Sequence, residues 1–388
     1  MKYLSKFITG VINKLTLMSF YLKVLKVGVL LRLARMSSKA CVIVKLSSTP
    51  LHFNFVKDLI QRLNDDAEVF VLIAYDFEKS RIDLPASAVV ISTSLIPYLS
   101  VDFVLTLDTG KAPVHTVSKL IHVPHSLASM HVIYPEGSFD YFDYIFCAGP
   151  HQLHELTQIL LKRGNKKCVL IPAGYEVVDR LMLGALPERH ALPVILFAPS
   201  WGESNALVLH GEEIVASLLD FCEVVLRPHV MSVTEDAKTL EAIRLRFENH
   251  PRFHLDLSAD SSMVLRRADL LISDWSGIAF EYALAFLRPV VFINGPMKVF
   301  NHNWSQYLNE PGIEMTARTE VGMIVDKIKN LPFVVNELLS TSNAWKEKIL
   351  QAREQLLFYP SQCAEISYSA LKLLANHQTA DGWVKIRC

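Results

Sequence analysis

Residues 269–283 read DLLISDWSGIAFEYA, an apolar run followed by a polar turn and a second apolar segment. Residues 270–273 have the length and composition of a buried strand, and residues 278–286 have the spacing of a helix. A strand that passes through a short turn directly into a helix is a building unit of α/β folds with parallel sheets. The stretch therefore predicts such a fold, with Asp274 and Ser276 just beyond the C-terminal end of a strand.

The same alternation of short apolar runs and helix-like stretches continues in both directions along the chain. We predict strands at residues 41–46, 69–74, 88–92, 103–107, 120–123, 144–148, 168–171, 194–198, 223–226, 253–255, 270–273 and 290–293. We predict helices at residues 51–63, 152–162, 212–219, 235–248, 262–268, 278–286, 321–339 and 344–357. Residues 174–193 contain two Gly and two Pro and little periodicity, which indicates a domain boundary.

The sequence thus predicts two Rossmann-like, doubly wound domains that face each other across a cleft. We place the first at residues 39–180 and the second at residues 190–360. A basic amphipathic segment, residues 1–38, precedes them, and a C-terminal helix and tail, residues 361–388, follow. Ligands of such open sheets sit at the C-terminal ends of the strands, so the residues after each strand are the candidates for chemistry.

Composition excludes several classes of protein. Hydrophobic residues make up 51% and charged residues 20%, which is typical of a globular protein and not of a disordered one. Lys plus Arg and Asp plus Glu both number 39, so no net charge favours nucleic acid as a partner. The six cysteines form no C-x-x-C pair, which favours free thiols in a reducing cytoplasm: Cys41, Cys147, Cys168, Cys222, Cys363 and Cys388.

Charge is nevertheless uneven at the amino terminus. Ten basic residues and no acidic one precede Asp58. Lys14, Lys23 and Lys26 interrupt the apolar runs, which argues against a spanning helix of about 20 apolar residues and against a signal peptide. The segment is typical of a helix that lies on an anionic membrane surface, and a first helix packed on the domain is the alternative.

The turn at residues 274–277 is the strongest candidate for an anion site. Ser276 and Gly277 stand at the start of a helix, where free N–H groups and the helix dipole favour phosphate, and Gly277 permits close approach of the backbone. Glu281, one turn later, is placed to contact a ribose diol. The alternative is that Asp274 or Ser276 simply caps the helix.

Two further strand ends carry polar groups that suit a phosphate ligand. Arg227 and His229 follow residues 223–226, and together they offer a guanidinium fork and an imidazole that donates to developing negative charge. Ser200 follows residues 194–198 and is a candidate phosphate contact, whereas Trp201 beside it is equally typical of a core residue. The alternative for Arg227 and His229 is an ordinary surface pair.

In the first half, residues 121–131 carry His122, His125 and His131 after a strand. A neutral imidazole can act as general base near neutral pH, and a three-histidine zinc site is the competing interpretation, which the spacing disfavours. The sequence contains no G-x-x-x-x-G-K-[ST], no G-x-G-x-x-G and no D-x-D motif. We therefore expect neither a Walker ATPase nor an ordinary NAD enzyme, and neither a metal nor a cofactor.

The ordered set of motifs resembles the CDP-glycerol glycerophosphotransferase family of teichoic-acid synthesis, a branch of the GT-B architecture. The resemblance covers residues 115–300 and rests on the strand-end histidine, APSW at 198–201, RPH at 227–229 and LISDWSG ahead of FEYA. The family's His-Gly motif falls on His125 and Ser126. Its Asp-Tyr-Ser-Ser motif falls on residues 274–277, where Gly277 lacks the second hydroxyl.

The resemblance implies a transferase that moves glycerol phosphate, or a related polyol phosphate, from a CDP-linked donor to a hydroxyl of a cell-envelope glycan or lipid-linked acceptor, with release of CMP. The second domain would bind the donor and the first the acceptor, with His125 as base and His229 near the diphosphate. Arg227, Ser200, Asp274, Ser276, Gly277 and Glu281 would bind substrate.

The family also implies a peripheral location at the cytoplasmic face of the membrane. Two alternatives stay open from the sequence. One is a GT-B glycosyltransferase that uses a nucleotide sugar for surface polysaccharide synthesis. The other is a non-catalytic nucleotide-binding protein at the membrane.

Overall fold

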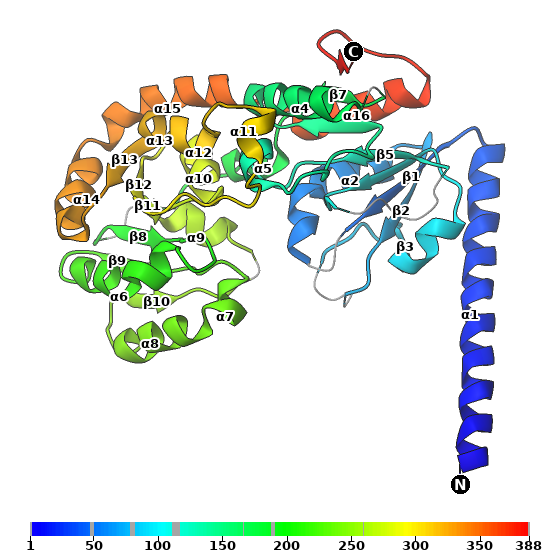
Figure 1. Ribbon diagram of the computed structural model, residues 1–388, viewed down its shortest axis with the longest axis horizontal. Coiled ribbons are helices and arrows are strands. Elements are labelled where there is room, and N and C mark those ends of the chain that lie inside the picture. Colours follow the sequence, from blue (N-terminus) through cyan, green and yellow to red (C-terminus); the bar gives the residue numbers. More distant parts are fainter. Residues whose placement is uncertain are drawn as a thin grey trace.

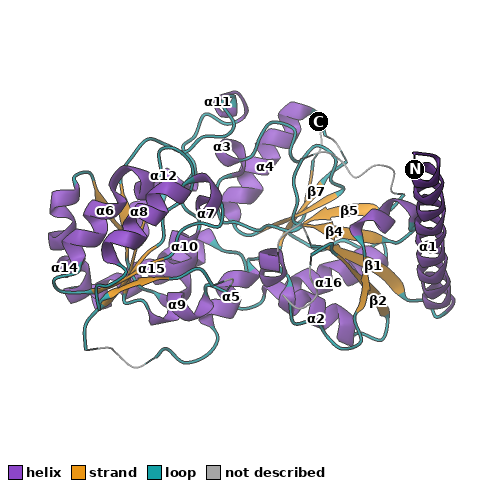
Figure 2. Ribbon diagram, turned by 90° about the horizontal axis from the view of Figure 1, so that it is seen from below, coloured by secondary structure: helices purple, strands orange, loops and turns teal. Residues whose placement is uncertain are grey.

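The computed structural model describes residues 2–46, 50–77, 82–110, 117–165, 167–187, 191–258 and 260–386, with side chains described from residue 18 onward. It consists of two lobes, each built around a sheet with helices on its faces (Figure 1, Figure 2). The chain crosses from the first lobe to the second near residue 175 and returns near residue 357.

The N-terminal sheet has the order β14-β7-β6-β5-β4-β1-β2-β3, and every described pair is parallel except β14 with β7. Its strands are β1 (Ala40–Lys45), β2 (Val69–Ala74), β3 (Val89–Ile91), β4 (Phe103–Thr106), β5 (Lys119–His122), β6 (Tyr144–Cys147), β7 (Val169–Pro172) and β14 (Val384–Lys385). Its helices are α1 (Lys2–Met36), η1 (Pro50–Phe55), α2 (Lys57–Asp65), η3 (Thr93–Tyr98), α3 (Met130–Ile133), α4 (Pro150–Arg163) and α16 (Cys363–Ala375).

The second sheet is parallel throughout, in the order β10-β9-β8-β11-β12-β13. Its strands are β8 (Val194–Phe197), β9 (Glu223–Leu226), β10 (Phe253–Leu255), β11 (Leu270–Ser273), β12 (Val290–Ile293) and β13 (Gly322–Val325). The helices of this part of the chain are α5 (Glu176–Met182), α6 (Ala206–Leu218), α7 (Ser232–Glu235), α8 (Ala237–Phe247), α9 (Ser262–Arg267), α10 (Ile278–Phe286), α11 (Trp304–Tyr307), α12 (Ile313–Thr316), α13 (Arg318–Val321), η4 (Ile328–Asn330), α14 (Leu331–Ser340) and α15 (Ser342–Leu356).

All twelve strands predicted from the sequence are present, with ends that differ by one residue at most. The prediction of one helix over residues 321–339 was wrong. Residues 322–325 instead form β13, because the edge of β12 offers four backbone partners to this apolar segment, and the helix α14 begins only at Leu331. Gly322 suits this edge, since a Cβ there would lie 1.9 Å from the carbonyl oxygen of Val290.

The segment expected to be an aperiodic boundary, residues 174–193, contains the helix α5, which joins the two lobes. Glu176 accepts hydrogen bonds from the backbone N–H groups of Asp58 (2.6 Å) and Leu59 (3.2 Å), at the start of α2. Asp179 accepts from those of Ser361 and Cys363 (both 2.7 Å), at the start of α16. The other face of α5 packs against α10. Buried carboxylates therefore fix the crossing point.

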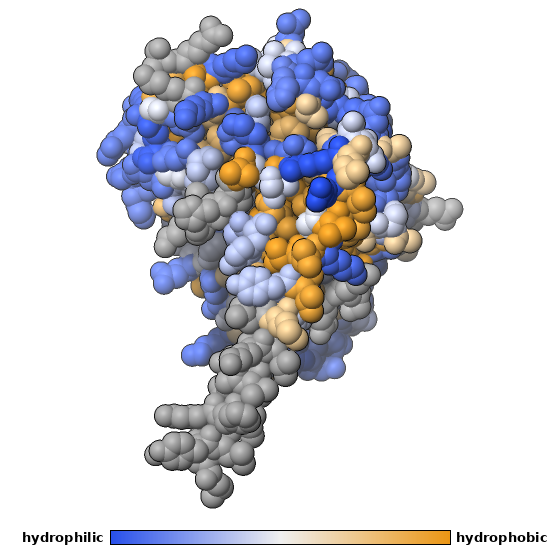
Figure 3. Space-filling view, turned by 90° about the vertical axis from the view of Figure 1, so that its right-hand side faces the viewer, coloured by the Kyte–Doolittle hydropathy of each residue, from blue (hydrophilic) through white to orange (hydrophobic). Residues whose placement is uncertain are grey.

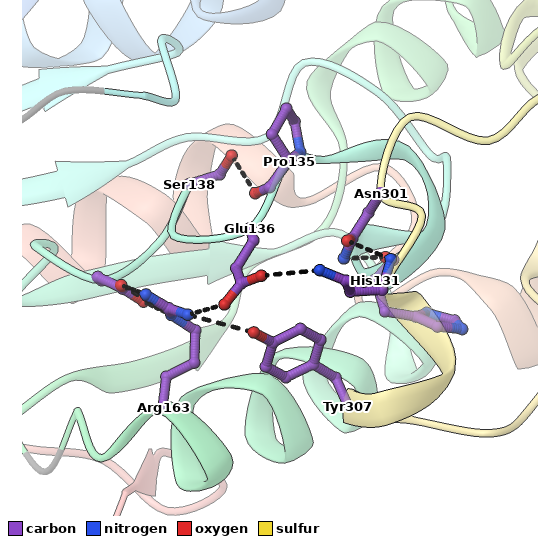
Figure 4. Close-up of polar contacts among 9 residues, drawn as sticks. His131, Pro135, Glu136, Ser138, Arg163, Asn301 and Tyr307 are labelled. Atoms are coloured by element: carbon purple, nitrogen blue, oxygen red, sulfur yellow. Dashed lines mark hydrogen bonds and ion pairs between the residues drawn. The ribbon is translucent and has the colours of Figure 1, made fainter.

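A loop after β12 runs back to the N-terminal lobe (Figure 4). The side-chain amide of Asn301 donates to the backbone carbonyl of His131 (2.9 Å), and Arg163 bonds to Glu136 and Tyr307. The core is also continuous between the lobes, because Leu127 packs in the same apolar cluster as Phe280. The lobes thus touch at other places besides the crossing helix.

Helix α1 stands at the outer edge of the N-terminal lobe and extends away from it (Figure 1). Val27, Leu31 and Ala34 are buried against the core of that lobe. The opposite face exposes large apolar side chains, gathered on the side of the molecule seen in Figure 3: Met18, Tyr21, Leu22, Leu25, Val29, Leu33 and Met36. We found no helix in the described residues that is long and apolar enough to cross a membrane.

Five cysteines are buried free thiols: Cys41, Cys147, Cys168, Cys222 and Cys363. Cys388 lies outside the described residues.

Candidate functional site

A cavity of about 700 Å³ lies between the lobes at the C-terminal ends of β8, β9 and β11. Its volume is within the range typical of small-molecule sites. From the first lobe and the crossing segment come Pro50, Leu51, Asn54, Phe55 and Val177. From the second come Arg227, His229, Ser276 and Glu281, four of the eight residues that the sequence singled out. A shallower hollow beside α6 and α8 contains none of those eight.

Asp274 joins the turns that follow β8 and β11. The buried carboxylate accepts hydrogen bonds from the Ser200 N–H (2.6 Å), the Ser200 hydroxyl (3.0 Å) and the Ala206 N–H (2.8 Å). Both of its oxygens therefore have protein partners, and Ser200 is buried as well. In this geometry Asp274 and Ser200 hold the two strand-end turns together at the edge of the cavity.

The N-terminus of α10 opens beside this pair. Gly277 is the residue before the helix, and no side chain caps it. The backbone N–H groups of Ser276, Gly277 and Ile278 have no acceptor among the described residues. Two of these residues, Ser276 and Ile278, line the cavity. Free amides and the positive end of the helix dipole make this edge suited to an anion.

Glu281 lies one turn further along α10 and also lines the cavity. One carboxylate oxygen accepts a hydrogen bond from the hydroxyl of Tyr175 in the crossing segment (2.7 Å). Burial raises the pKa of Glu281 to about 7. The second oxygen has no protein partner in the described part of the chain, so it is available to accept from a ligand hydroxyl.

Arg227 and His229 follow β9 and also line the cavity. The Arg227 guanidinium contacts Asp256 and Ser258, which orient it and offset part of its charge. Burial, together with the nearby charge of Lys298, lowers the pKa of His229 to about 4. Nδ1 of His229 accepts the Met231 N–H (3.2 Å), so we assign the proton of the neutral ring to Nε2, as a donor.

Lys298 is a cation that the sequence analysis missed. It follows β12, and its Nζ lies 4.4 Å from the ring centre of Trp201 and 5.1 Å from that of Phe300. Burial lowers the pKa of Lys298 to about 8. Trp201 in turn stacks on His229, with 5.9 Å between ring centres. The strand-end rule, applied to residues 290–293 as it was to the other strands, would have led to this residue.

Arg318 is the second residue that sequence reasoning missed. Its guanidinium is buried, lies 3.5 Å from the ring centre of Trp275, and donates to the backbone carbonyl of Asp274 (3.4 Å). It lies on α13, and only tertiary packing brings it under the turn at residues 274–277.

His125 lies in the first lobe, beside Phe55, which lines the cavity (6.2 Å between ring centres). It also stacks on His52 (5.5 Å between ring centres). Burial lowers the pKa of His125 to about 4 and that of His122 to about 3, so both rings are neutral at neutral pH. Nδ1 of His125 is buried and has no partner among the described residues. His125 therefore has the protonation state that a general base requires.

The three histidines of residues 121–131 do not converge. His131 contacts Glu155 (3.3 Å) and the backbone oxygen of Glu310 (2.9 Å), whereas His122 lies against Phe139 and Phe142. Within the described ranges no group of three or more His, Cys, Asp or Glu side chains is placed to hold a metal ion.

Residues 174–361 match the model of a family described as CDP-glycerol:poly(glycerophosphate) glycerophosphotransferase. The family expected from the motif order is thereby confirmed for these residues. No curated protein matches the chain.

Solved structures with similar folds include the wall teichoic acid polymerase TagF (14% identity, TM-score 0.59, 88% of this chain and 90% of that chain). A variant of this polymerase after a soak with CDPG is similar as well (15% identity, TM-score 0.57, 92% of this chain and 97% of that chain). So is S. aureus MnaA with UDP (14% identity, TM-score 0.59, 88% of this chain and 99% of that chain). At these identities the likeness shows the fold, and it confirms the predicted GT-B architecture.

Proposed function

We propose, from the membership of residues 174–361 in the CDP-glycerol:poly(glycerophosphate) glycerophosphotransferase family, that the chain transfers glycerol phosphate from CDP-glycerol to an acceptor hydroxyl of a cell-wall glycopolymer. The observation that carries the proposal is one cavity in which the motif residues Arg227, His229 and Ser276 meet. Its position at the ends of β8, β9 and β11 is where open α/β sheets bind nucleotides.

In the proposed reaction, the acceptor hydroxyl oxygen attacks the phosphorus that carries glycerol. The bond between that phosphorus and the oxygen bridging to CMP breaks, and CMP leaves with the bridging oxygen. The neutral imidazole of His125 takes the hydroxyl proton. Burial lowers the pKa of His125. An anion bound close by stabilises the imidazolium, which raises this pKa and makes the base stronger when the donor is present.

Charge on the diphosphate would be stabilised by three kinds of group. The free amides at the start of α10 belong to residues at the cavity, His229 lines the cavity and would donate through Nε2–H, and the Lys298 cation lies near that ring. Such groups are already fixed before the reaction and lower the barrier where negative charge develops. Arg227 would contact the nucleotide, and Glu281 would accept a ribose hydroxyl.

Ser200 and Asp274, predicted to bind substrate, take a supporting part in this proposal. Their hydrogen bonds to one another fix the turn that presents Ser276. Gly277 would admit the diphosphate close to the helix backbone. No step of the reaction requires a metal or a cofactor.

The proposed acceptor is a lipid-linked glycan, and α1 supports a position at the inner membrane surface. The exposed apolar face of α1, defined by Met18, Tyr21, Leu22, Leu25, Val29, Leu33 and Met36, is accompanied by the exposed cations Lys23, Lys26 and Arg32. An apolar stripe with basic flanks binds anionic lipid, and each cation near the surface contributes about 1 kcal/mol.

The test is donor turnover with identification of the nucleotide released. Purified protein is incubated with CDP-glycerol, CDP-ribitol or a panel of UDP-sugars in the presence of a lipid-linked acceptor extract. We expect CMP from CDP-glycerol, and strongly reduced release by His125→Ala and His229→Ala. Release of a nucleoside diphosphate from a sugar donor would make the protein a glycosyltransferase on the same fold. Nucleotide binding without any turnover would make it a non-catalytic binding protein.

A further inference from the structure

Ser126 of the first lobe and Gly277 of the second meet at the edge of the cavity. A Cβ atom on Gly277 would lie 3.0 Å from Oγ of Ser126 and 4.0 Å from the backbone nitrogen of Leu127. Gly277 stands between Ser276 and Ile278, which line the cavity, and directly precedes α10. The hydroxyl of Ser126 therefore lies next to the space that a side chain on residue 277 would occupy.

The loop that carries Ser126 is held from both lobes. The side-chain amide of Gln152 donates to the carbonyl of Ser126 (2.8 Å), and Nε2 of His151 contacts that of Leu127 (3.0 Å). From the second lobe, Glu314 accepts the N–H of Ser129 (2.8 Å). The backbone that carries the hydroxyl is thus fixed by contacts from both lobes before any ligand binds.

The hydroxyl of Ser126 has a proton to donate. Its oxygen accepts the N–H of Ala128 (3.0 Å), and among the residues that the structure describes its own proton has no acceptor. The N–H groups of Gly277 and Ile278 likewise have none in that part of the chain. Unused donors from two lobes therefore surround the start of α10, an arrangement that favours an anion there.

We propose that Ser126 is a donor-binding residue of the N-terminal lobe, whose hydroxyl hydrogen-bonds to the diphosphate at the start of α10. This deepens the proposed function and rests on it, because it assigns Ser126 to the same donor. Ser at 126 and Gly at 277 are the two departures from the family motifs noted above, and the structure places them in contact. The diphosphate site is then complete only when the two lobes meet.

The first measurement is the dissociation constant of CDP by calorimetry for wild type and Ser126→Gly. A hydrogen bond to a charged group is worth enough that its loss should weaken CDP binding about tenfold or more. Cytidine, which lacks phosphate, should bind both proteins equally. An unchanged dissociation constant of CDP in Ser126→Gly would overturn the proposal.

A pair of double variants separates the hydroxyl from packing. Ser126→Gly with Gly277→Ser vacates the crowded position and supplies a hydroxyl from the other lobe, so CDP affinity should recover most of the loss. Ser126→Gly with Gly277→Ala supplies the same Cβ without a hydroxyl and should stay weak. Equal recovery by both would show that packing alone matters and would overturn the proposal.

The outcome is separable from that of the proposed function because CDP contains no glycerol. If wild type binds CDP in a Ser126-dependent way but releases no CMP from CDP-glycerol, the proposed transfer fails and the binding role of Ser126 stands. If CMP is released and Ser126→Gly binds CDP as wild type does, the transfer stands and the role of Ser126 fails. If wild type neither binds CDP nor releases CMP from CDP-glycerol, both fail.

Discussion

His125, His229 and Lys298 are three residues whose ionisation is set by burial near one cavity. The low local dielectric disfavours the charged form, so burial lowers the pKa of each group. Lys298 adds to this effect at His229, because a nearby positive charge opposes a second one. The site without ligand therefore has neutral imidazoles in both lobes and a partly desolvated cation.

Removal of the proposed base gives the first prediction. His125→Ala should lower kcat by about 100-fold or more, the usual contribution of a general base, and leave the dissociation constant of CDP unchanged.

In wild type, the base is lost only as pH falls through the lowered pKa of His125, so kcat/KM should persist below the ordinary imidazole pKa of about 6.5. Initial rates between about pH 5 and 8 test this. An acidic limb near the ordinary value would contradict it.

The coupling of Lys298 to His229 gives a second prediction. Lys298→Met removes the positive charge that lowers the pKa of His229, so that pKa should rise, and the KM for CDP-glycerol should increase about tenfold. An NMR titration of the His229 ring measures the first effect and steady-state kinetics the second. Lys346→Met, an exposed lysine on α15, is the matched control and should change neither. A His229 pKa that stays fixed in Lys298→Met would contradict the effect assigned to the Lys298 charge.

Among the elements, α5 decides how the lobes are joined. Its carboxylates cap α2 and α16, two helices of the N-terminal lobe, while its other face packs on α10 of the second lobe. Burial raises the pKa of Glu176 to about 8 and also raises that of Asp179. Hydrogen bonds from backbone N–H groups offset the cost of burying these two carboxylates.

The cap on α16 leads to a third prediction, for stability. Asp179→Ala leaves the N–H groups of Ser361 and Cys363 without an acceptor and should lower the free energy of unfolding by about 1–2 kcal/mol. Asp179→Asn keeps one carbonyl acceptor and removes the buried charge, so it should cost less. Urea unfolding of the two variants measures the difference. Equal losses would show that the charge, and not the hydrogen bonds, matters.

At the scale of the whole molecule, the two apolar faces of α1 have different surroundings. The inner face joins the core of the N-terminal lobe through Val27, Leu31 and Ala34, and the outer face is exposed (Figure 3). The helix is therefore anchored to the enzyme along part of its length while a second stripe stays open to another surface.

The fourth prediction concerns that open stripe. Wild type should sediment with vesicles that contain anionic lipid, and Leu25→Glu with Val29→Glu should abolish this, because charges on the apolar face oppose both insertion and attraction to anionic headgroups. Both side chains are more than half exposed, so folding and CDP affinity should not change. Binding of the double variant equal to that of wild type would rule out this face. Vesicles of neutral lipid serve as the control surface.

The sequence by itself determined the alternation of strands and helices and the residues at the strand ends. Short apolar runs and helical spacing are local patterns, which is why the twelve strands and the positions of Arg227, His229 and Ser276 followed from them. The same rule was not carried to the end of β12, so Lys298 was missed. The prediction from local spacing failed at residues 322–325, where a free sheet edge outweighed the local preference for helix.

Only the tertiary structure decided which of those residues share a cavity and what each one contacts. The carboxylate of Asp274 binds Ser200, 74 residues away, and Tyr175 binds Glu281, 106 residues away. Ser126 meets Gly277 across the two lobes, and the chain returns through α16 to cover its own first domain. Such pairs have no signature in local periodicity, because they arise when separate elements bury their apolar faces together and bring distant polar groups within hydrogen-bond distance.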